Sequence, residues 1–196
     1  MGLDVRLRTA RLYLSTDLRE STRDFGNFVE AAFAGGVDIL QVRQEGVDAG
    51  KLLEALDLAR TISYHFQGLV VVQGDAALAG RFAADVLHLG QTDVAPAAAR
   101  PQLHQWALIG QSAHNSDQVR RAAADAEVDY LSVGPVNLSG PAEHPAPGLD
   151  LVRAAATIQP PGQQDSKPWF ASGGIDEDTV DEVLEAGARR VWVTRA

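Results

Sequence analysis

The stretch AGGVDILQV, residues 34–42, passes from small residues through Asp38 into a short apolar run. The same arrangement recurs along the chain at nearly even spacing, so the fold is expected to contain several copies of one structural unit. The further copies are RFAADVLHLG (81–90, with Asp85), AEVDYLSVG (126–134, with Asp129) and a weaker one, EAGARRVWV (185–193, with Arg189 and Arg190 at the turn).

Four more apolar runs of strand length lie before or between these copies, which brings the number to eight. Candidate helices follow the runs, for example residues 49–66, 116–126 and 176–186, and we expect Ser116 and Asp176 to be the N-caps of the last two. Short apolar runs that alternate with helices predict parallel strands with crossover connections. An open doubly wound sheet gives the same local pattern, but the repeat and the count of eight favour an α/β fold of the (β/α)8 TIM barrel type. The additional runs are RLYLST (11–16), GLVVVQG (68–74), WALIGQSA (106–113) and KPWFASGG (167–174).

The end of the chain is unusual for such a barrel. Residues 191–196, VWVTRA, follow the last apolar run directly, so we expect one domain, residues 1–196, that lacks the final helix. Such barrels usually have about 250 residues, which predicts a compact version or a chain without its natural tail. An uncovered last strand would expose apolar surface and favour coverage by a partner. We expect residues 158–168, IQPPGQQDSKP, to form a surface loop at the end of the barrel away from the site.

Composition narrows the class of protein. Hydrophobic residues make up 45% and charged residues 22%, as in ordinary soluble globular proteins. The net charge of −9 argues against a general nucleic-acid binder, because phosphate contacts need a basic surface. There is no cysteine, which excludes disulfides and thiolate chemistry. The first ten residues, MGLDVRLRTA, contain no apolar segment, and no stretch of the chain approaches membrane-span length, so we expect a cytoplasmic protein.

Ligands of a parallel barrel bind at the carboxyl ends of the strands. The turn SGGI, residues 172–175, could bring backbone N–H groups close to a phosphate, and Arg43 could grip one. Glu45, in the same loop as Arg43, would repel that phosphate. The residues expected at these strand ends are Gln41, Arg43, Gln73, Gly74, Asp75, His88, Gly90, Gln91, Asp93, Ser112, His114, Gly134, Pro135, Gly173, Gly174, Val193 and Thr194.

Five motifs, in order over nearly the whole chain, resemble those of thiamine-phosphate synthase. The resemblance implies a (β/α)8 barrel, usually a homodimer, that joins hydroxymethylpyrimidine diphosphate to thiazole phosphate with Mg²⁺ and releases pyrophosphate. It implies a dissociative reaction, in which metal and cationic groups stabilise the departing diphosphate and the thiazole nitrogen captures a pyrimidine carbocation. The implied partners are small phosphorylated pyrimidine and thiazole ligands, with no nucleic acid and no membrane. The motifs are GGVDILQVR (35–43), ADVLHLGQTD (84–93), IGQSAH (109–114), DYLSVGPV (129–136) and WFASGGI (169–175).

Matched residue by residue, the resemblance also implies roles for the strand-end side chains. Ser112 and Arg43 match groups at the reacting centre, and Asp93 matches a Mg²⁺ ligand. The implied substrate contacts are Gln41 and Arg43 for pyrophosphate, Gly173, Val193 and Thr194 for the thiazole phosphate, and Gln73 and His114 as further contacts.

The departures from the family's pattern fall on its charged positions. Glu45 takes the place of the lysine in the family's Gln-x-Arg-x-Lys pattern, and Gly74 takes the place of the aspartate in its Asn-Asp pair. One charge pair at about 6 Å is worth roughly 3 kcal/mol at an effective dielectric of about 20, so we expect impaired synthase activity. Lys51 reaching inward, or Asp75 turning toward a metal, could compensate. In the family's Thr-x-Thr-Lys loop, Ser139 stands for the first threonine, and Pro141 and Ala142 replace the second threonine and the lysine.

Several of these residues also have a plain structural interpretation. Arg43 could pair with Glu45, and Asp93 could cap the helix that follows it. His88 lies inside an apolar run and is expected to be a hydrogen-bonded core residue. His114 could line the pocket or pack beneath the turn that follows it.

Three functions stay open at this point. The first is a synthase with impaired activity, and the second is an inactive relative that binds thiazole phosphate or thiamine phosphate as a sensor or carrier. The third is a thiazole tautomerase, which is the weakest because its catalytic histidine would fall at Pro135, and proline cannot shuttle protons.

Overall fold

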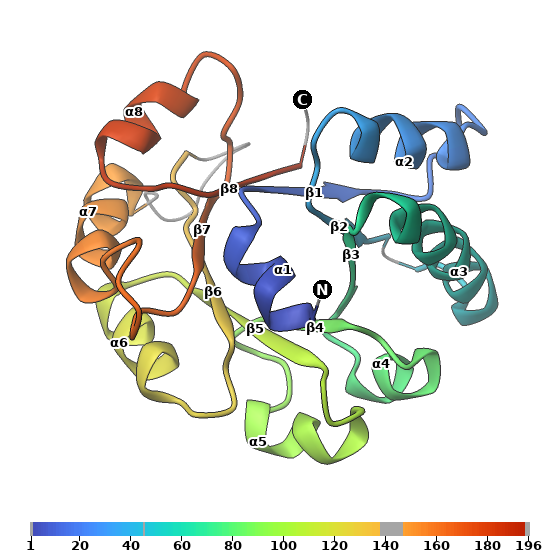
Figure 1. The fold of residues 1–196 in the computed structure, drawn as a ribbon, viewed down its shortest axis with the longest axis horizontal. Helices are drawn as coiled ribbons and strands as arrows, with labels where there is room; N and C mark the ends of the chain where they lie inside the picture. The colour runs from blue at the N-terminus through green and yellow to red at the C-terminus, as the bar shows by residue number, and fades with distance from the viewer. Residues whose placement is uncertain (1, 45, 138–146, 195–196) are drawn as a thin grey trace.

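Eight parallel strands close into a barrel with helices around it (Figure 1). The computed structural model describes residues 2–44, 46–137 and 147–194. Each strand pairs in parallel with the next, and the first pairs with the last, which confirms the barrel and excludes the open sheet. The strands are β1 (Leu12–Thr16), β2 (Ile39–Val42), β3 (Leu69–Gln73), β4 (Val86–Leu89), β5 (Leu108–Ala113), β6 (Tyr130–Val133), β7 (Trp169–Ser172) and β8 (Val191–Val193).

Helices cover the outside of the barrel between consecutive strands. Among the described residues no helix follows β8, as the sequence predicted. None of the helices in the described ranges is long and apolar enough to cross a membrane. The helices are α1 (Leu3–Thr9), α2 (Phe25–Ala34), α3 (Ala49–Phe66), α4 (Ala76–Phe82), α5 (Pro96–Ala99) with the 3₁₀ turn η1 (Arg100–Gln102), α6 (Ser116–Ala124), α7 (Gly148–Ile158) and α8 (Val180–Glu185).

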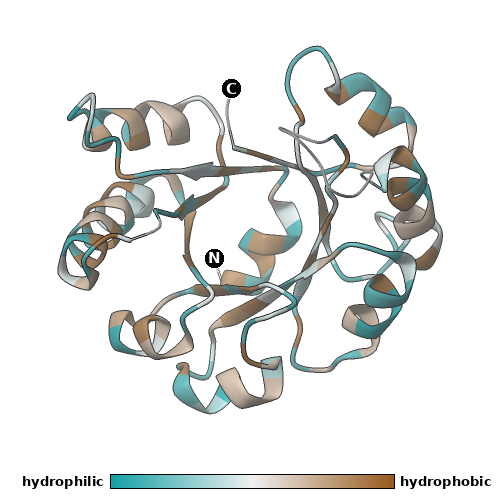
Figure 2. Cartoon of the chain, turned by 180° about the vertical axis from the view of Figure 1, so that it is seen from behind, coloured by the Kyte–Doolittle hydropathy of each residue, from teal (hydrophilic) through white to brown (hydrophobic). Residues whose placement is uncertain are grey.

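Helix α1 closes the amino-terminal end of the barrel, and it is visible through the ring of strands from both sides (Figures 1 and 2). Leu7 is 1% exposed and belongs to the same apolar cluster as the barrel residues Tyr13 and Phe170. This helix is not predicted by the sequence pattern, because its seven residues mix charged and apolar side chains without a strong periodicity.

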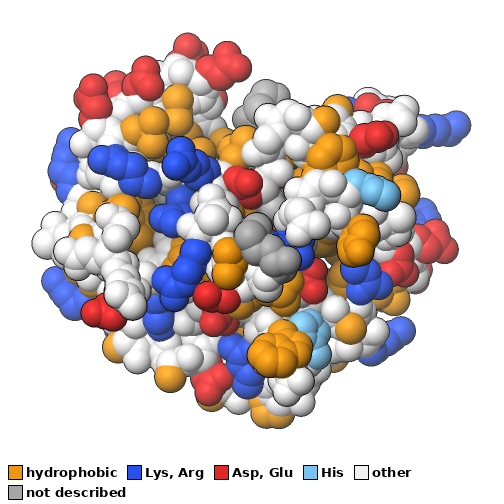
Figure 3. Space-filling view, viewed as in Figure 1, with side chains coloured by type: hydrophobic (Ala, Val, Ile, Leu, Met, Phe, Trp, Pro, Cys, Tyr) orange, Lys and Arg blue, Asp and Glu red, His pale blue; other side chains and the backbone are white. Residues whose placement is uncertain are grey.

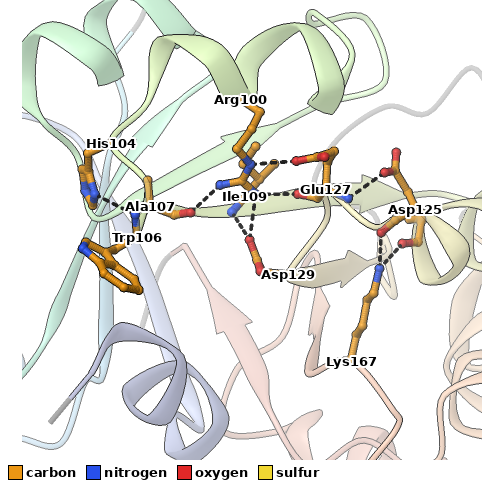
Figure 4. A network of polar contacts seen from close by, with 10 residues as sticks. Arg100, His104, Trp106, Ala107, Ile109, Asp125, Glu127, Asp129 and Lys167 are labelled. Carbon is orange, nitrogen blue, oxygen red and sulfur yellow. Dashed lines mark hydrogen bonds and ion pairs between the residues drawn. The ribbon is translucent and has the colours of Figure 1, made fainter.

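The repeated aspartates have a structural role at the starts of strands. Asp38 precedes β2, and its Oδ2 accepts the N–H groups of Arg11 at 2.7 Å and of Leu12 at 3.0 Å. Asp129 precedes β6, and its Oδ2 accepts the N–H of Ile109 in β5 at 2.7 Å (Figure 4). In both copies the carboxylate binds the start of the preceding strand, which fixes the register where the barrel begins.

Basic side chains gather at the amino-terminal end, although the protein is acidic overall (Figure 3). Arg8, Lys167 and Arg190 line a cavity of ≈ 600 Å³ beside residues 162–168, so this loop lies away from the carboxyl ends of the strands, as predicted. Arg190 Nε donates to the carbonyl of Ala10 at 3.0 Å, and Lys167 Nζ donates to the carbonyl of Ala122 at 3.1 Å. These cations therefore satisfy backbone carbonyls left at chain turns and helix ends.

Two predicted helix starts need correction. Ser116 is the first residue of α6, and the cap is Asn115, whose Oδ1 accepts the N–H of Gln118 at 2.9 Å. Helix α8 begins at Val180 with Thr179 as the N-cap residue. Asp176 instead accepts from the N–H of Thr179 at 3.1 Å and closes the turn before the helix. Helix α6 also ends at Ala124 rather than at 126, and α8 at Glu185 rather than at 186, whereas α3 has its predicted bounds.

We predict that Asp38→Ala lowers the free energy of unfolding by about 1 to 3 kcal/mol, because it leaves two strand-start N–H groups without their acceptor. Urea unfolding measures this. Asp150→Ala is the matched control, since Asp150 is 92% exposed in a surface pair with Arg153, and its effect should stay within about 0.5 kcal/mol. Equal stability of the two variants would contradict the proposed role of the aspartate.

Candidate active site

Two of the predicted phosphate contacts and one glycine of the predicted phosphate-binding turn meet at one cavity. Arg43 after β2, Gly174 after β7 and Thr194 after β8 line a space of ≈ 550 Å³ at the carboxyl ends of the strands. The carboxylates of Asp17 and Asp176 line the same cavity. A phosphate bound there would therefore meet acidic as well as basic groups, and it would need additional positive charge nearby.

The glycines after β7 are required by the backbone. Gly173 and Gly174 have φ angles of 94° and 62°, in the left-handed region that favours glycine. A Cβ on Gly173 would lie 2.6 Å from Cβ of Pro135, and one on Gly174 would lie 2.8 Å from Cβ of Asn137. The carbonyl of Gly173 accepts the N–H of Asn137 at 2.8 Å. The turn is thus held rigidly against the segment that leaves β6, beside the cavity.

Asp93 lies against two glycines near the end of β4. Its Oδ2 accepts the N–H of Gly90 at 2.7 Å, and a Cβ on Gly74 would come within 3.2 Å of the same oxygen. Asp93 does not cap the next helix, because α5 begins at Pro96 with Ala95 as its N-cap residue. Within the described ranges, no group of three or more His, Asp or Glu side chains could hold a metal ion.

Polar side chains fill the upper interior of the barrel, on the side toward the carboxyl ends. His88 in β4 is fully buried, and its Nε2 lies 2.9 Å from Ser112 Oγ in β5. Its Nδ1 lies 3.0 Å from the hydroxyl of Tyr130 in β6. Both ring nitrogens thus have partners, which confirms the prediction of a hydrogen-bonded core histidine.

The same row of contacts continues across the barrel to β3. Tyr13 in β1 packs beside Tyr130, with ring centroids 6.3 Å apart. The hydroxyl of Tyr13 donates to Gln41 Oε1 in β2 at 2.6 Å. Gln41 Nε2 donates to Gln73 Oε1 at 2.7 Å. Gln41 is 1% exposed, so it lies in the floor of the site rather than on its surface.

Burial sets the protonation of this interior. It lowers the pKa of His88 to about 3, with a smaller contribution from the charge of His114. It also raises the pKa of both Tyr13 and Tyr130, because a buried phenolate would be poorly solvated. At neutral pH the floor of the site is therefore uncharged.

The remaining strand-end residues lie at the rim. His114 is exposed, and its Nδ1 is 2.7 Å from the carbonyl of Gly134, so it braces the end of β6. Gln91 donates to the carbonyl of Ser112. Val193 is half-buried between two apolar clusters. Contact with a ligand stays a prediction for all of these residues.

Neither of the two possible compensations for the missing charges is present. Lys51 does not reach inward, because its Nζ pairs with Glu20 at 3.3 Å on the surface. Asp75 does not turn toward a metal, because its Oδ1 accepts the N–H of Leu78 at 2.8 Å and caps α4. The predictions about Glu45, Ser139, Pro141 and Ala142 lie outside the described residues.

Sequence reasoning missed the two tyrosines and the serines of the floor. Tyr13 and Tyr130 stand in apolar runs, where an aromatic residue is usually read as core. Ser132 and Ser172 face each other with hydroxyls 3.0 Å apart, and Trp192 Nε1 donates to Ser15 Oγ at 2.7 Å. The sequence did contain one usable signal, because side chains along a strand point alternately to its two faces. A polar residue two positions after an aromatic residue that points into the barrel must therefore point inward as well.

The comparisons with known proteins agree with this geometry. Residues 12–196 match the family model described as thiamine monophosphate synthase. The chain belongs to the thiamine monophosphate synthase family. It is 45% identical to the thiamine-phosphate synthase of Streptomyces avermitilis over 97% of this chain and 87% of the relative, and 43% identical to that of Mycobacterium leprae over 99% and 86%. Among solved structures, the thiamine phosphate pyrophosphorylase from Pyrococcus furiosus has a TM-score of 0.81 at 24% identity over 97% of this chain and 87% of that one, which supports the fold.

We predict that His88 makes stability depend on pH. Its folded-state pKa of about 3 lies below its ordinary value of 6.5, so between these values the unfolded chain binds more protons. The contribution of His88 to the free energy of unfolding is complete above about pH 6.5. Below that pH it decreases by up to about 1.4 kcal/mol per pH unit. Urea unfolding at about pH 7.5 and at about pH 5.5 measures how much free energy of unfolding is lost on acidification. This loss should be about 1 kcal/mol smaller in His88→Gln than in the wild type. Exposed His65 supplies the control, because His65→Gln should keep the full loss. An equal loss in all three proteins would contradict the prediction.

Proposed function

We propose that the protein is a thiamine-phosphate synthase, which joins hydroxymethylpyrimidine diphosphate to thiazole phosphate and releases pyrophosphate. The observation that carries the proposal is the meeting of Arg43, Gly174 and Thr194 at one cavity over the carboxyl ends of the strands. Relatives of this family at 43–45% identity bear the name thiamine-phosphate synthase. The sensor and tautomerase alternatives have no observation of their own in their favour.

The reaction asks little covalent chemistry of the protein. The bond between the pyrimidine methylene carbon and the diphosphate oxygen breaks, and its electron pair leaves with the diphosphate. The lone pair of the thiazole nitrogen then forms the new C–N bond. The site must neutralise the departing charge and keep water from the carbon, so no nucleophilic side chain is needed.

The side chains around the cavity divide this work. The guanidinium of Arg43 supplies positive charge and can bind two phosphate oxygens at once. The rigid turn at Gly173 and Gly174 holds the thiazole phosphate through backbone N–H groups, and Thr194 closes the far side. Ser112, Gln73 and His114 contact the pyrimidine from the floor and rim. Gln41 acts indirectly, because its amide holds Gln73.

A magnesium ion fits this site in a limited way. Asp93 offers one carboxylate beside Gly74 and Gly90. Mg²⁺ commonly binds through one or two carboxylates together with substrate phosphates and water. Asp93 would therefore hold an ion that arrives with the diphosphate, and the bound ion would supply positive charge to the leaving group. That positive charge is needed all the more because Asp17 and Asp176 add negative charge to the same cavity.

Turnover is low in this proposal, because Gly74 offers no second carboxylate and the substitutions at residues 45 and 142 remove two cations from the family's pattern.

The homodimer stays a prediction, which sedimentation of the purified protein decides.

A synthase assay with both substrates and Mg²⁺ tests the function. We expect product and pyrophosphate in equal amounts at a rate below about 1 s⁻¹, the low edge for typical enzymes. Arg43→Ala should lower kcat/KM by about 10- to 100-fold, because a charge-assisted contact is lost. Arg43→Lys, which keeps the charge, should lose less. Complete absence of product would overturn the proposal, and calorimetric binding of thiazole phosphate without turnover would support a sensor.

We predict that Glu45→Lys, Gly74→Asp and Ala142→Lys together raise turnover at least about tenfold. Each step returns a charge that stabilises the departing diphosphate or its metal, and roughly 1.4 kcal/mol corresponds to tenfold. Aspartate tolerates the left-handed φ of 71° at Gly74 better than most residues. The matched control replaces Gly74→Asp by Gly74→Asn, which has the same shape without the charge. If the wild type already turns over near 1 s⁻¹, or if the two triple variants behave alike, the account of low turnover is wrong.

A further inference from the structure

A cavity with basic walls lies at the amino-terminal end of the barrel, opposite the candidate active site (Figure 3). Its volume is ≈ 600 Å³, and its walls come from three parts of the chain. Arg8 belongs to α1, Lys167 belongs to the loop that leads into β7, and Arg190 directly precedes β8. Because β7 and β8 are paired, the cavity lies at the starts of two neighbouring strands.

The charge of these walls is opposite to the charge of the whole chain. Arg8, Lys167 and Arg190 all line the cavity, and among the described residues around it only Asp165 is acidic. Over the full sequence, 26 acidic residues outnumber 17 basic ones. Three cations facing one carboxylate leave the cavity with an excess of positive charge.

Arg190 is held in place by neutral groups and is surrounded by like charge. Its Nε donates to the carbonyl of Ala10 at 3.0 Å, and its Nη2 donates to the carbonyl of Arg8 at 2.9 Å. These carbonyls satisfy N–H groups but do not neutralise the guanidinium, which stays charged. Burial lowers the pKa of Arg190, and the charges of Arg11 and Arg8 lower it further. A bound anion would relieve this repulsion.

Lys167 is fixed in a similar way. Its Nζ donates to the carbonyl of Ala122 at 3.1 Å and to the carbonyl of Asp125 (Figure 4). Burial lowers the pKa of Lys167, while the nearby charges of Asp125 and Asp129 raise it. Lys167 therefore contributes a cation in a set position, whose charge is balanced only from the side away from Arg190.

Arg8 is the cation that a ligand can recruit most easily. Its Nε lies 3.2 Å from Oδ1 of Asp4, one turn earlier on α1. Both side chains are largely exposed, at 51% and 66%, and an ion pair of that kind contributes little. An anion in the cavity can therefore compete with Asp4 for the guanidinium.

The lining favours a small anion of high charge. Guanidinium groups bind phosphate oxygens two at a time, and the side chains of Gln163, Gln164 and Ser166 supply further hydrogen-bond donors. The lining residues that the structure describes include no aromatic side chain on which a nucleobase could stack. The concave shape suits a small molecule better than the surface of a macromolecule.

We propose that Arg8, Lys167 and Arg190 form a binding site for a small polyphosphate anion, of the diphosphate or triphosphate class, at the amino-terminal end of the barrel. The site is separate from the cavity at Arg43 and does not depend on the proposed function. A bound anion joins α1 to the starts of β7 and β8, so it stabilises the folded chain.

Amide ¹H–¹⁵N spectra of the full chain, titrated with sodium triphosphate, locate the site. Mg²⁺ is left out, so that metal-dependent binding at the other end of the barrel does not contribute. We expect saturating shifts at Ser166, Lys167 and Arg190 with a Kd below about 1 mM at low salt, and weaker binding at higher ionic strength. Arg43→Ala should show the same shifts, because it alters only the opposite end.

Arg8→Gln tests the site with little risk to the fold, because this side chain is half exposed. It should weaken triphosphate binding by about 3- to 10-fold, and Arg8→Glu should weaken it further. Arg153→Gln is the matched control. It removes an arginine that is 59% exposed and paired with Asp150 on its own helix, so the net charge changes equally. Its Kd should equal that of the wild type.

ATP compares a nucleotide with a free polyphosphate of similar charge. If the phosphates alone are recognised, the two Kd values should agree within about threefold, and an at least tenfold tighter Kd for ATP would contradict the proposed ligand class. Shifts that do not saturate, shifts confined to Gly173 and Gly174, or equal weakening in Arg8→Gln and Arg153→Gln would overturn the site itself. Synthase turnover without these shifts would refute only this inference, and the shifts without turnover would refute only the proposed function.

Discussion

The interior of a closed eight-stranded barrel must be filled by side chains, and here the filling changes from apolar to polar toward the carboxyl ends. Below, α1 and the residues around Tyr13 and Phe170 form an apolar cluster. Above, amides, hydroxyls and one imidazole satisfy one another, since unpaired polar groups at that depth would cost stability. Among the described residues, every buried side-chain nitrogen and oxygen has a hydrogen-bond partner. This condition fixes the shape of the site floor before any ligand binds.

A preformed and uncharged floor suits the proposed chemistry. In the proposed reaction the charge that changes lies on the diphosphate, which the proposal places in the cavity near Arg43 at the rim. The proposal places the pyrimidine against the neutral floor, so that binding and charge stabilisation belong to separate parts of the site. The acidic groups at the rim, Asp17 and Asp176, explain why a metal ion belongs to the proposal.

The sequence predicted the parts of the structure that depend on local pattern. All eight strands follow from apolar runs, and α3 has the bounds predicted for it. Helix α1 was missed because its stability comes from burial in the barrel mouth rather than from its own pattern. Asn115 and Ser116 are both capping residues, so their order along the chain could not decide which one is the cap.

Site prediction reached the strand ends and His88, but it missed the tyrosines of the floor. Arg43, Gly174 and Thr194 were found because they follow strands, and the fold brings those ends together. The link from His88 to Tyr130 joins residues 42 positions apart. Its existence depends on the room left by Gly110, where a Cβ would lie 2.1 Å from Cζ of Tyr130, and sequence pattern alone does not reveal it.

The central claim is that uncharged polar side chains fill the floor and satisfy one another's hydrogen bonds within the barrel. Neutron diffraction from a perdeuterated crystal tests it most directly, because it locates the exchanged hydrogens of the whole floor in one map. The account predicts a singly protonated ring of His88 at neutral pH, bonded directly to Ser112 and Tyr130. A doubly protonated ring, or a water molecule inserted between Ser112 and His88, would contradict it.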